Sequence, residues 1–228
     1  MEIPGVLLLA VTILGLLAGA VVCVVSLVRG WAGVARSIAM VSIAWIAAYA
    51  SLLIVTSLAS RERTLALGET KRFCGFYLDC HIGVAVEHVD TMSSIGDVRA
   101  GGTFYVVTLR VSSDAKRVPL HLESPSVAII DGEGFRYDRS LDVERKLARD
   151  EPVDLERLVE AGHSFTRVVV IDVPHGVRSP RLRVTMGGSL DRALELAVIG
   201  DEDAFLHAPT LHALVPGSGI SSASVDAR

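Results

Sequence analysis

The sequence predicts a pair of membrane-spanning helices followed by an all-β domain, an antiparallel β-sandwich. The chain of 228 residues is 50% hydrophobic with a mean hydropathy of +0.47, which is too apolar for an ordinary soluble domain of this size. Only three of its 22 basic and 26 acidic side chains lie in residues 1–60, so the apolar excess is at the N-terminus. The rest of the chain alternates apolar and polar residues with the period of two that is typical of half-buried strands.

Two uncharged runs, residues 5–28 and 37–59, are each long enough to cross a bilayer as a helix, which takes about 20 apolar residues. The stretch from Arg29 to Arg36 between them is so short that the helices must return as an antiparallel hairpin. Both chain termini then lie on one side of the membrane. Close helix packing is predicted at small residues of the two runs, namely Gly15, Gly19, Ala20, Ala44, Ala47 and Ala48.

A cleaved signal peptide is the main alternative to the hairpin. The small residues Ala18, Gly19 and Ala20 have the character of a cleavage site. However, no Lys or Arg precedes the first apolar run, and the run continues well past Ala20. Both features favour the hairpin, and hence the lipid bilayer as a partner of the chain.

The orientation of the hairpin is predicted from the cysteines, because the basic residues on its two sides favour opposite orientations. Arg29 and Arg36 favour a cytoplasmic turn, whereas four basic residues within 61–72 favour a cytoplasmic location for the segment after the second helix. Cys23 lies in the first apolar run, where it packs as a small hydrophobe. Cys74 and Cys80 form a pair in the polar domain, and in a non-reducing compartment such a pair is most often a disulfide. We therefore expect an extracytoplasmic domain with Cys74 joined to Cys80.

The polar domain contains short runs with the character of strands, separated by turn residues and without long helices, which is typical of an antiparallel sandwich. The turn Asp131-Gly132-Glu133-Gly134 predicts a hairpin between two of them. The run 165–173 is almost continuously apolar, which predicts a central strand. The predicted strands cover residues 82–86, 105–111, 126–131, 135–137, 165–173 and 181–186.

Two segments depart from this pattern. Residues 139–161 are rich in charge, and Asp154 as an N-cap with Gly162 as a stop predicts one or two helical turns over 154–159. After Ile199 an acidic turn and a Gly/Ser-rich end follow, and we expect the last ten residues to be frayed. The predicted organisation is a transmembrane hairpin (1–60), a juxtamembrane segment (61–79), a sandwich (80–200), and an acidic turn with a tail (201–228).

Four motifs in order along the domain give a resemblance to a known family. They are a long strand at Gly102–Val111, a D-G-x-G hairpin at Ile130–Tyr137, a glycine before a strand at Ala161–Phe165, and a D-V-P strand end at Ile171–Pro174. This order resembles the telokin-like, immunoglobulin-like domains of unknown function found at bacterial cell surfaces. The resemblance covers residues 80–186. It implies an antiparallel immunoglobulin-like β-sandwich in the bacterial envelope, here a multi-pass protein of the cytoplasmic membrane, and it supplies no catalytic residues.

Three local patterns could carry chemistry. Cys74, Cys80 and His81 offer soft ligands for zinc or copper, but their spacing fits neither a zinc motif nor haem attachment, so a structural disulfide is favoured. Asp201, Glu202 and Asp203 could bind calcium, although they do not follow the EF-hand pattern. The stretch Gly162–Phe165 lacks the second glycine of a nucleophile elbow. We therefore predict no catalytic residue and no cofactor.

The function that these observations predict is a binding or structural module that contacts another protein or an envelope component. Its candidate surfaces are residues 139–161 and the turn from Asp201 to His207. Two alternatives stay open: a metal or redox protein that uses Cys74, Cys80 and His81, and an accessory subunit of a transport or secretion assembly. The net charge of −4, without a basic cluster, argues against a nucleic-acid partner.

Overall fold

The computed structural model describes residues 3–74, 80–148 and 154–214, and it separates the chain into two compact units. The helical unit consists of Met1–Glu62 and Ser189–Pro209, and the β unit consists of Arg63–Gly188 and Thr210–Arg228. This division differs from the predicted boundaries. Strands lie in the segment 61–79 and after residue 209, and residues 189–209 belong with the helices.

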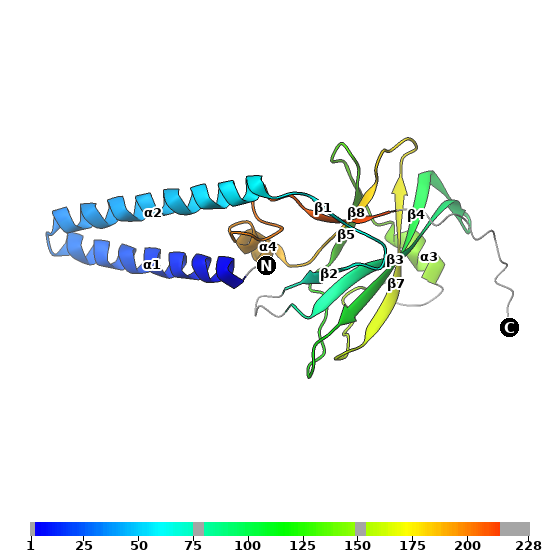
Figure 1. The fold of residues 1–228 in the computed structure, drawn as a ribbon, viewed down its shortest axis with the longest axis horizontal. Coiled ribbons are helices and arrows are strands. Elements are labelled where there is room, and N and C mark those ends of the chain that lie inside the picture. Colours follow the sequence, from blue (N-terminus) through cyan, green and yellow to red (C-terminus); the bar gives the residue numbers. More distant parts are fainter. Residues whose placement is uncertain (1–2, 75–79, 149–153, 215–228) are drawn as a thin grey trace. The chain divides into compact units, whose positions relative to one another are not determined.

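The helical unit is built on an antiparallel pair, α1 (Ile3–Val28) and α2 (Ala32–Ala59), drawn in blue and cyan in Figure 1. Both helices are long and apolar enough to cross a membrane, by length and composition. Only 6% and 0% of their most apolar windows are buried, so neither is the core helix of a globular fold. A sharp turn joins them, in which the Trp31 amide donates to the Ser26 carbonyl at 2.7 Å.

The contact between α1 and α2 uses one of the predicted small residues. A Cβ atom added to Gly19 would lie 3.4 Å from Ser42 Oγ, whereas one added to Gly15 would meet nothing within 4 Å. Trp45 Nε1 donates to Thr12 Oγ1 at 3.3 Å across the pair. The predicted contact at the other small residues is wrong, because the helices meet on a different face and leave these residues exposed: Gly15, Ala20, Ala44, Ala47 and Ala48.

The β unit contains two sheets. The five-stranded sheet has the order β1-β9-β8-β5-β6, and the four-stranded sheet has the order β2-β3-β4-β7. All pairs are antiparallel except β1 with β9, which are parallel. The strands are β1 (Arg63–Leu65), β2 (Thr70–Phe73), β3 (Ile82–Ile95), β4 (Val98–Ser113), β5 (Ser126–Ile130), β6 (Arg136–Asp138), β7 (Ser164–Val173), β8 (Arg181–Thr185) and β9 (Thr210–Ala213).

Alternating apolar side chains of the two sheets form one core between them, as the period-two pattern predicts. Val84, Leu109 and Ile171 come from the four-stranded sheet, and Ile129 and Leu182 from the other; each is at most 3% exposed. Because burial of apolar surface is the main force that stabilises a domain, this shared core makes the two sheets a sandwich.

A second, smaller core lies where α3 (Leu141–Ala148) packs against the four-stranded sheet. Val143 of the helix belongs to one buried cluster with Phe104, Val106 and Val170. Glu144 is buried, forms an ion pair with Arg139, and accepts a hydrogen bond of 3.0 Å from the Val170 amide. The carboxylate therefore fastens the helix to β7, which is consistent with the rule that buried charges are paired.

Two predictions about this region are wrong. The run 165–173 forms an edge strand, β7, and its apolar residues are explained by α3 and the interior, which bury both of its faces. The helix predicted over 154–159 is absent, and α3 precedes it in the chain. The segment is irregular, and its Leu155 and Val159 side chains are buried in the core. The Val159 amide and carbonyl both bond to the Leu120 backbone, which holds the segment against its neighbour.

The ends of the strands decide where the loops gather. The chain passes between the two units just before β1, after β8 and just before β9, and the strand register puts these three points at one end of the five-stranded sheet. The turn after β5 and the loop before β8 are at the other end of that sheet, because Ile130 pairs with Arg181. Loops at an end of a sandwich are its usual binding surface.

Candidate binding site at one end of the sandwich

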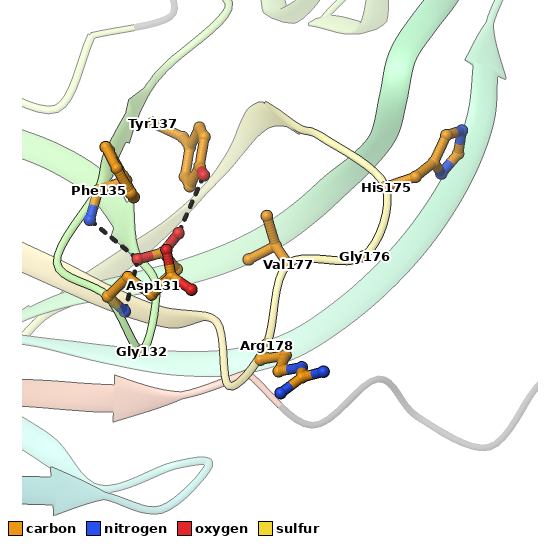
Figure 2. Close-up of a pocket in the computed structure, with 9 residues that line it drawn as sticks. Asp131, Gly132, Phe135, Tyr137, His175, Gly176, Val177 and Arg178 are labelled. Atoms are coloured by element: carbon orange, nitrogen blue, oxygen red, sulfur yellow. Dashed lines mark hydrogen bonds between the residues drawn. The ribbon is translucent and has the colours of Figure 1, made fainter.

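The turn between β5 and β6 and the loop between β7 and β8 line an open cavity of about 690 Å³ at the end of the sandwich without links to the helical unit. The two loops are held together by a hydrogen bond of 3.1 Å from the Gly132 amide to the Arg178 carbonyl. Figure 2 shows the residues that line the cavity, which are Asp131, Gly132, Glu133, Phe135, Tyr137, His175, Gly176, Val177 and Arg178.

Asp131 organises the turn that carries the site. Its Oδ1 atom accepts hydrogen bonds of 2.9 Å from the amides of Glu133 and Phe135, and its Oδ2 atom accepts one of 3.0 Å from the Tyr137 hydroxyl. Burial by itself disfavours the charged carboxylate, but these hydrogen bonds outweigh it and lower the pKa of Asp131. Both oxygens are thus engaged in shaping the turn, which assigns Asp131 a structural role.

The accessible part of the site combines apolar groups with polar and charged ones. Phe135 is 62% exposed although it is a large aromatic residue, and Val177 on the facing loop lines the same cavity (Figure 2). The side chains of Glu133, His175 and Arg178, which also line the cavity, are exposed. Such a surface suits a ligand with an apolar group and nearby hydrogen-bonding or charged groups, since aromatic residues and Arg dominate binding surfaces.

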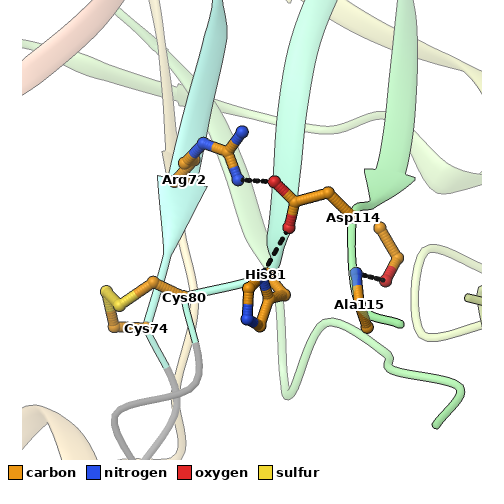
Figure 3. Close-up of polar contacts among 7 residues, drawn as sticks. Arg72, Cys74, Cys80, His81, Asp114 and Ala115 are labelled. Atoms are coloured by element: carbon orange, nitrogen blue, oxygen red, sulfur yellow. Dashed lines mark hydrogen bonds and ion pairs between the residues drawn. A yellow bond between two sulfur atoms is a disulfide. The ribbon is translucent and has the colours of Figure 1, made fainter. Parts of the chain in front are cut away.

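The predicted cysteine pair lies at the opposite end of the four-stranded sheet, where Ile82 pairs with Ser113. Cys74 and Cys80 form a disulfide, which confirms the predicted pairing (Figure 3). The bond joins the end of β2 to the start of β3. Two of the three soft ligands of the alternative metal site are therefore bonded to each other and do not offer thiolates.

His81 is part of a polar cluster next to this disulfide. Its Nδ1 atom lies 2.6 Å from Asp114 Oδ1, and Arg72 forms an ion pair with the other oxygen of the same carboxylate (Figure 3). The hydrogen bonds from Arg72 and then from His81 lower the pKa of Asp114. The three side chains are 48–57% exposed, so solvent screens the cluster and it contributes little to stability.

The acidic residues Asp201, Glu202 and Asp203 belong to the helical unit. Asp201 is 4% exposed, its Oδ1 atom accepts a hydrogen bond of 2.9 Å from the Asp203 amide, and burial raises its pKa. Within residues 3–74, 80–148 and 154–214, no group of three or more His, Cys, Asp or Glu is placed to hold a metal ion. The geometry is that of a turn closed by its first aspartate.

Sequence reasoning missed the main residue of the site. The D-G-x-G turn predicts the hairpin, but the same pattern places Phe135, directly after it, in a strand. The signal for a binding residue is a large aromatic side chain beside a glycine-rich turn, since Gly134 has a φ of +90° and leaves the next side chain at the tip of the hairpin. Of the predicted surface at 139–161, residues 149–153 lie outside the described residues; Val143, Leu155 and Val159 pack in the interior, and most of the other described residues are exposed.

Neither a protein-family model nor a curated protein sequence matches this chain. Solved structures give matches at low identity. The secreted protein MPT63 of Mycobacterium tuberculosis is 11% identical over 68% of this chain and 99% of its own, with a TM-score of 0.41. An uncharacterised β-sandwich protein of Clostridium difficile 630 is 7% identical over 68% and 96% of the two chains, with a TM-score of 0.38. A conserved hypothetical protein of Bacillus anthracis is 19% identical over 52% and 88%, with a TM-score of 0.34. The chain is thus similar to bacterial proteins that include a β-sandwich, and the similarity concerns the fold alone.

Proposed function

We propose that this chain is a non-catalytic binding module of the bacterial envelope, anchored in the cytoplasmic membrane by α1 and α2. Its ligand is a protein or envelope component that the exposed Phe135 contacts. The observation that carries the proposal is the cavity around Phe135, which lies at the end of the sandwich opposite the three links to the helical unit.

The membrane anchor is supported by the surface of the helices. Leu14, Val21 and Val41 are 63–69% exposed. In water, a protein with so large an exposed apolar surface over two whole helices would aggregate. In a bilayer the same side chains meet lipid, and the helix backbone satisfies its own polar groups. A cleaved signal peptide would need only the first helix, whereas here α2 packs against α1 through Trp45 and Thr12.

The extracytoplasmic location is supported by the Cys74–Cys80 disulfide, because cytosolic thiols are kept reduced. The resemblance of residues 80–186 to telokin-like, immunoglobulin-like domains of bacterial cell surfaces points to the same compartment. Domains of this architecture bind through the loops at the ends of their sheets, which is where the cavity lies.

Photo-crosslinking in living cells tests the binding surface. Benzoylphenylalanine at position 135 should give a specific adduct with a partner molecule. The matched control is the same residue at position 118, since Val118 is 55% exposed but follows β4 at the other end of the four-stranded sheet. No adduct at position 135, or equal adducts at both positions, would reject the proposed surface.

A second variant separates binding from folding. Because Phe135 is 62% exposed, Phe135→Ala should change the free energy of unfolding by no more than about 0.5 kcal/mol. The variant should nevertheless fail to co-purify with the partner that the crosslinking experiment identifies. A large loss of stability would show instead that the side chain serves the fold.

A further inference from the structure

A patch of exposed apolar side chains lies on the helical unit, in the segment that follows α4 (Ser189–Glu195). Leu196, Phe205 and Leu206 are 49%, 52% and 55% exposed. The Phe205 amide donates to the Leu196 carbonyl at 3.0 Å, which brings the ends of the segment together. Leu206 has a φ of +63°, a left-handed conformation that favours Gly or Asn, yet an apolar side chain occupies it.

Two hydrogen bonds fix the position of this segment along α2. The Tyr49 hydroxyl donates to the Ala197 carbonyl at 2.6 Å, and the Ala208 amide donates to Ser60 Oγ at 2.8 Å. Tyr49 and Ser60 are about 16 Å apart along a helix, so the segment runs beside the last three turns of α2. It also touches α1, since a Cβ atom added to Gly5 would lie 2.1 Å from the Ile199 carbonyl oxygen.

The length of α2 indicates what surrounds these turns. Its 28 residues extend over about 42 Å, more than the roughly 30 Å of a hydrocarbon core. One end of the helix must therefore pass through the interfacial layer. The last three turns expose Leu52, Val55 and Leu58, a surface that suits an apolar environment. Tyr49 is a residue type enriched at such interfaces.

The backbone of the segment is suited to a water-poor environment. In lipid, each backbone amide needs a partner within the protein. Most backbone amides of the segment donate a hydrogen bond to an acceptor of the same unit. The amides that do so are those of Leu196, Ala197, Val198, Asp201, Asp203, Ala204, Phe205, His207 and Ala208.

We propose that Leu196, Phe205 and Leu206 insert into the acyl-chain boundary of the bilayer, on the side where α2 ends. This inference rests on the proposed membrane anchor and adds a second, interfacial contact to it. The segment after β8 thus returns to the membrane before the chain re-enters the sandwich at β9.

Lipid quenching tests this contact in the full chain. Leu206→Cys and, separately, Phe205→Cys are made in a Cys23→Ala background, labelled with the fluorophore NBD, and placed in phosphatidylcholine–phosphatidylglycerol nanodiscs. Quenching by lipids with a spin label near the headgroup end of the acyl chain is compared with quenching by aqueous iodide. Val118→Cys is the matched control for exposure, and Val55→Cys on α2 reports the anchor.

We expect several-fold stronger lipid quenching at positions 205 and 206 than at 118, together with protection from iodide. Iodide quenching at 205 and 206 with lipid quenching at 55 would overturn the inference and leave the anchor standing. Protection from both quenchers would mean that protein covers the patch, which also overturns it. Iodide quenching at position 55 would overturn the anchor itself.

Discussion

At the scale of single residues, His212 is the most unusual group of the sandwich. It lies on β9, is completely buried, and has no hydrogen-bond partner for either ring nitrogen among the described residues. Lys71 from β2 is buried close by and donates to the Val184 carbonyl at 2.9 Å. Burial, and then the charge of Lys71, lower the pKa of His212 from 6.5 to about 4, while Glu69 opposes the shift. His212 is therefore neutral in the folded protein at neutral pH.

This residue predicts a pH dependence of stability. Between pH 6.5 and about 4 the unfolded chain binds a proton at His212 that the folded chain does not bind, so stability is complete above pH 6.5 and falls as the pH drops. The loss should reach about 2 kcal/mol at pH 5. Urea unfolding followed by circular dichroism at pH 7 and pH 5 measures it. His212→Leu should remove the difference and the exposed control His121→Gln should keep it; equal pH dependence in both variants would contradict the prediction.

At the scale of elements, the disulfide should stabilise the β2–β3 connection. It closes a loop with a sequence separation of six residues, and restricting that loop in the unfolded chain is worth about 2 kcal/mol. The double variant Cys74→Ser/Cys80→Ser should lose this amount in urea unfolding, and a reductant should have the same effect on the wild-type chain. Cys23→Ala is the control: it should leave the free energy of unfolding of the oxidised chain unchanged, because Cys23 lies outside the disulfide. An unchanged urea midpoint after reduction would show that β2 does not depend on the bond.

The α1–α2 contact predicts different effects for two glycines. Gly19→Leu should push the helices apart, because Ser42 and Ile38 lie 3.4 and 3.7 Å from an added Cβ, whereas Gly15→Leu meets nothing. Cys23 Sγ lies 3.7 Å from the Ala35 carbonyl, so an Ala35→Cys variant can report the approach by oxidative crosslinking to Cys23. The crosslink should be lost with Gly19→Leu and kept with Gly15→Leu. Equal yields would place the contact elsewhere.

Elements with strong local patterns could be predicted from the sequence, and elements that depend on distant partners could not. The apolar runs predict both helices, and alternation predicts β3, β4, β5 and β8. By contrast, β1 has three residues and pairs with β9, which lies almost at the other end of the described chain. The site divides in the same way: Asp131 and its turn are local, but the cavity needs the approach of Gly132 to Arg178.

At the scale of the whole molecule, the chain alternates between the two units. It leaves the helical unit at β1, returns after β8, and joins the sandwich again at β9. Strands β1 and β9 are parallel neighbours, so the chain comes into the sandwich twice at the same end of one sheet. All three crossings use that end, which leaves the loops around Phe135 at the other end unconnected to the helices.

The proposed membrane anchor, together with the disulfide, predicts an orientation for the chain. Because the hairpin places both of its ends on one side, the sandwich with Cys74 and Cys80 should be outside and the α1–α2 turn inside. In spheroplasts with a Cys23→Ala background, an impermeant maleimide should label Cys74 and Cys80 only after treatment with an impermeant reductant. Gly33→Cys reports the turn, since nothing lies within 4 Å of an added Cβ there, and it should be labelled only after lysis. The reverse pattern, with Cys74 and Cys80 labelled after lysis without reductant, would put the sandwich in the cytoplasm and return Cys74, Cys80 and His81 to consideration as a metal or redox site.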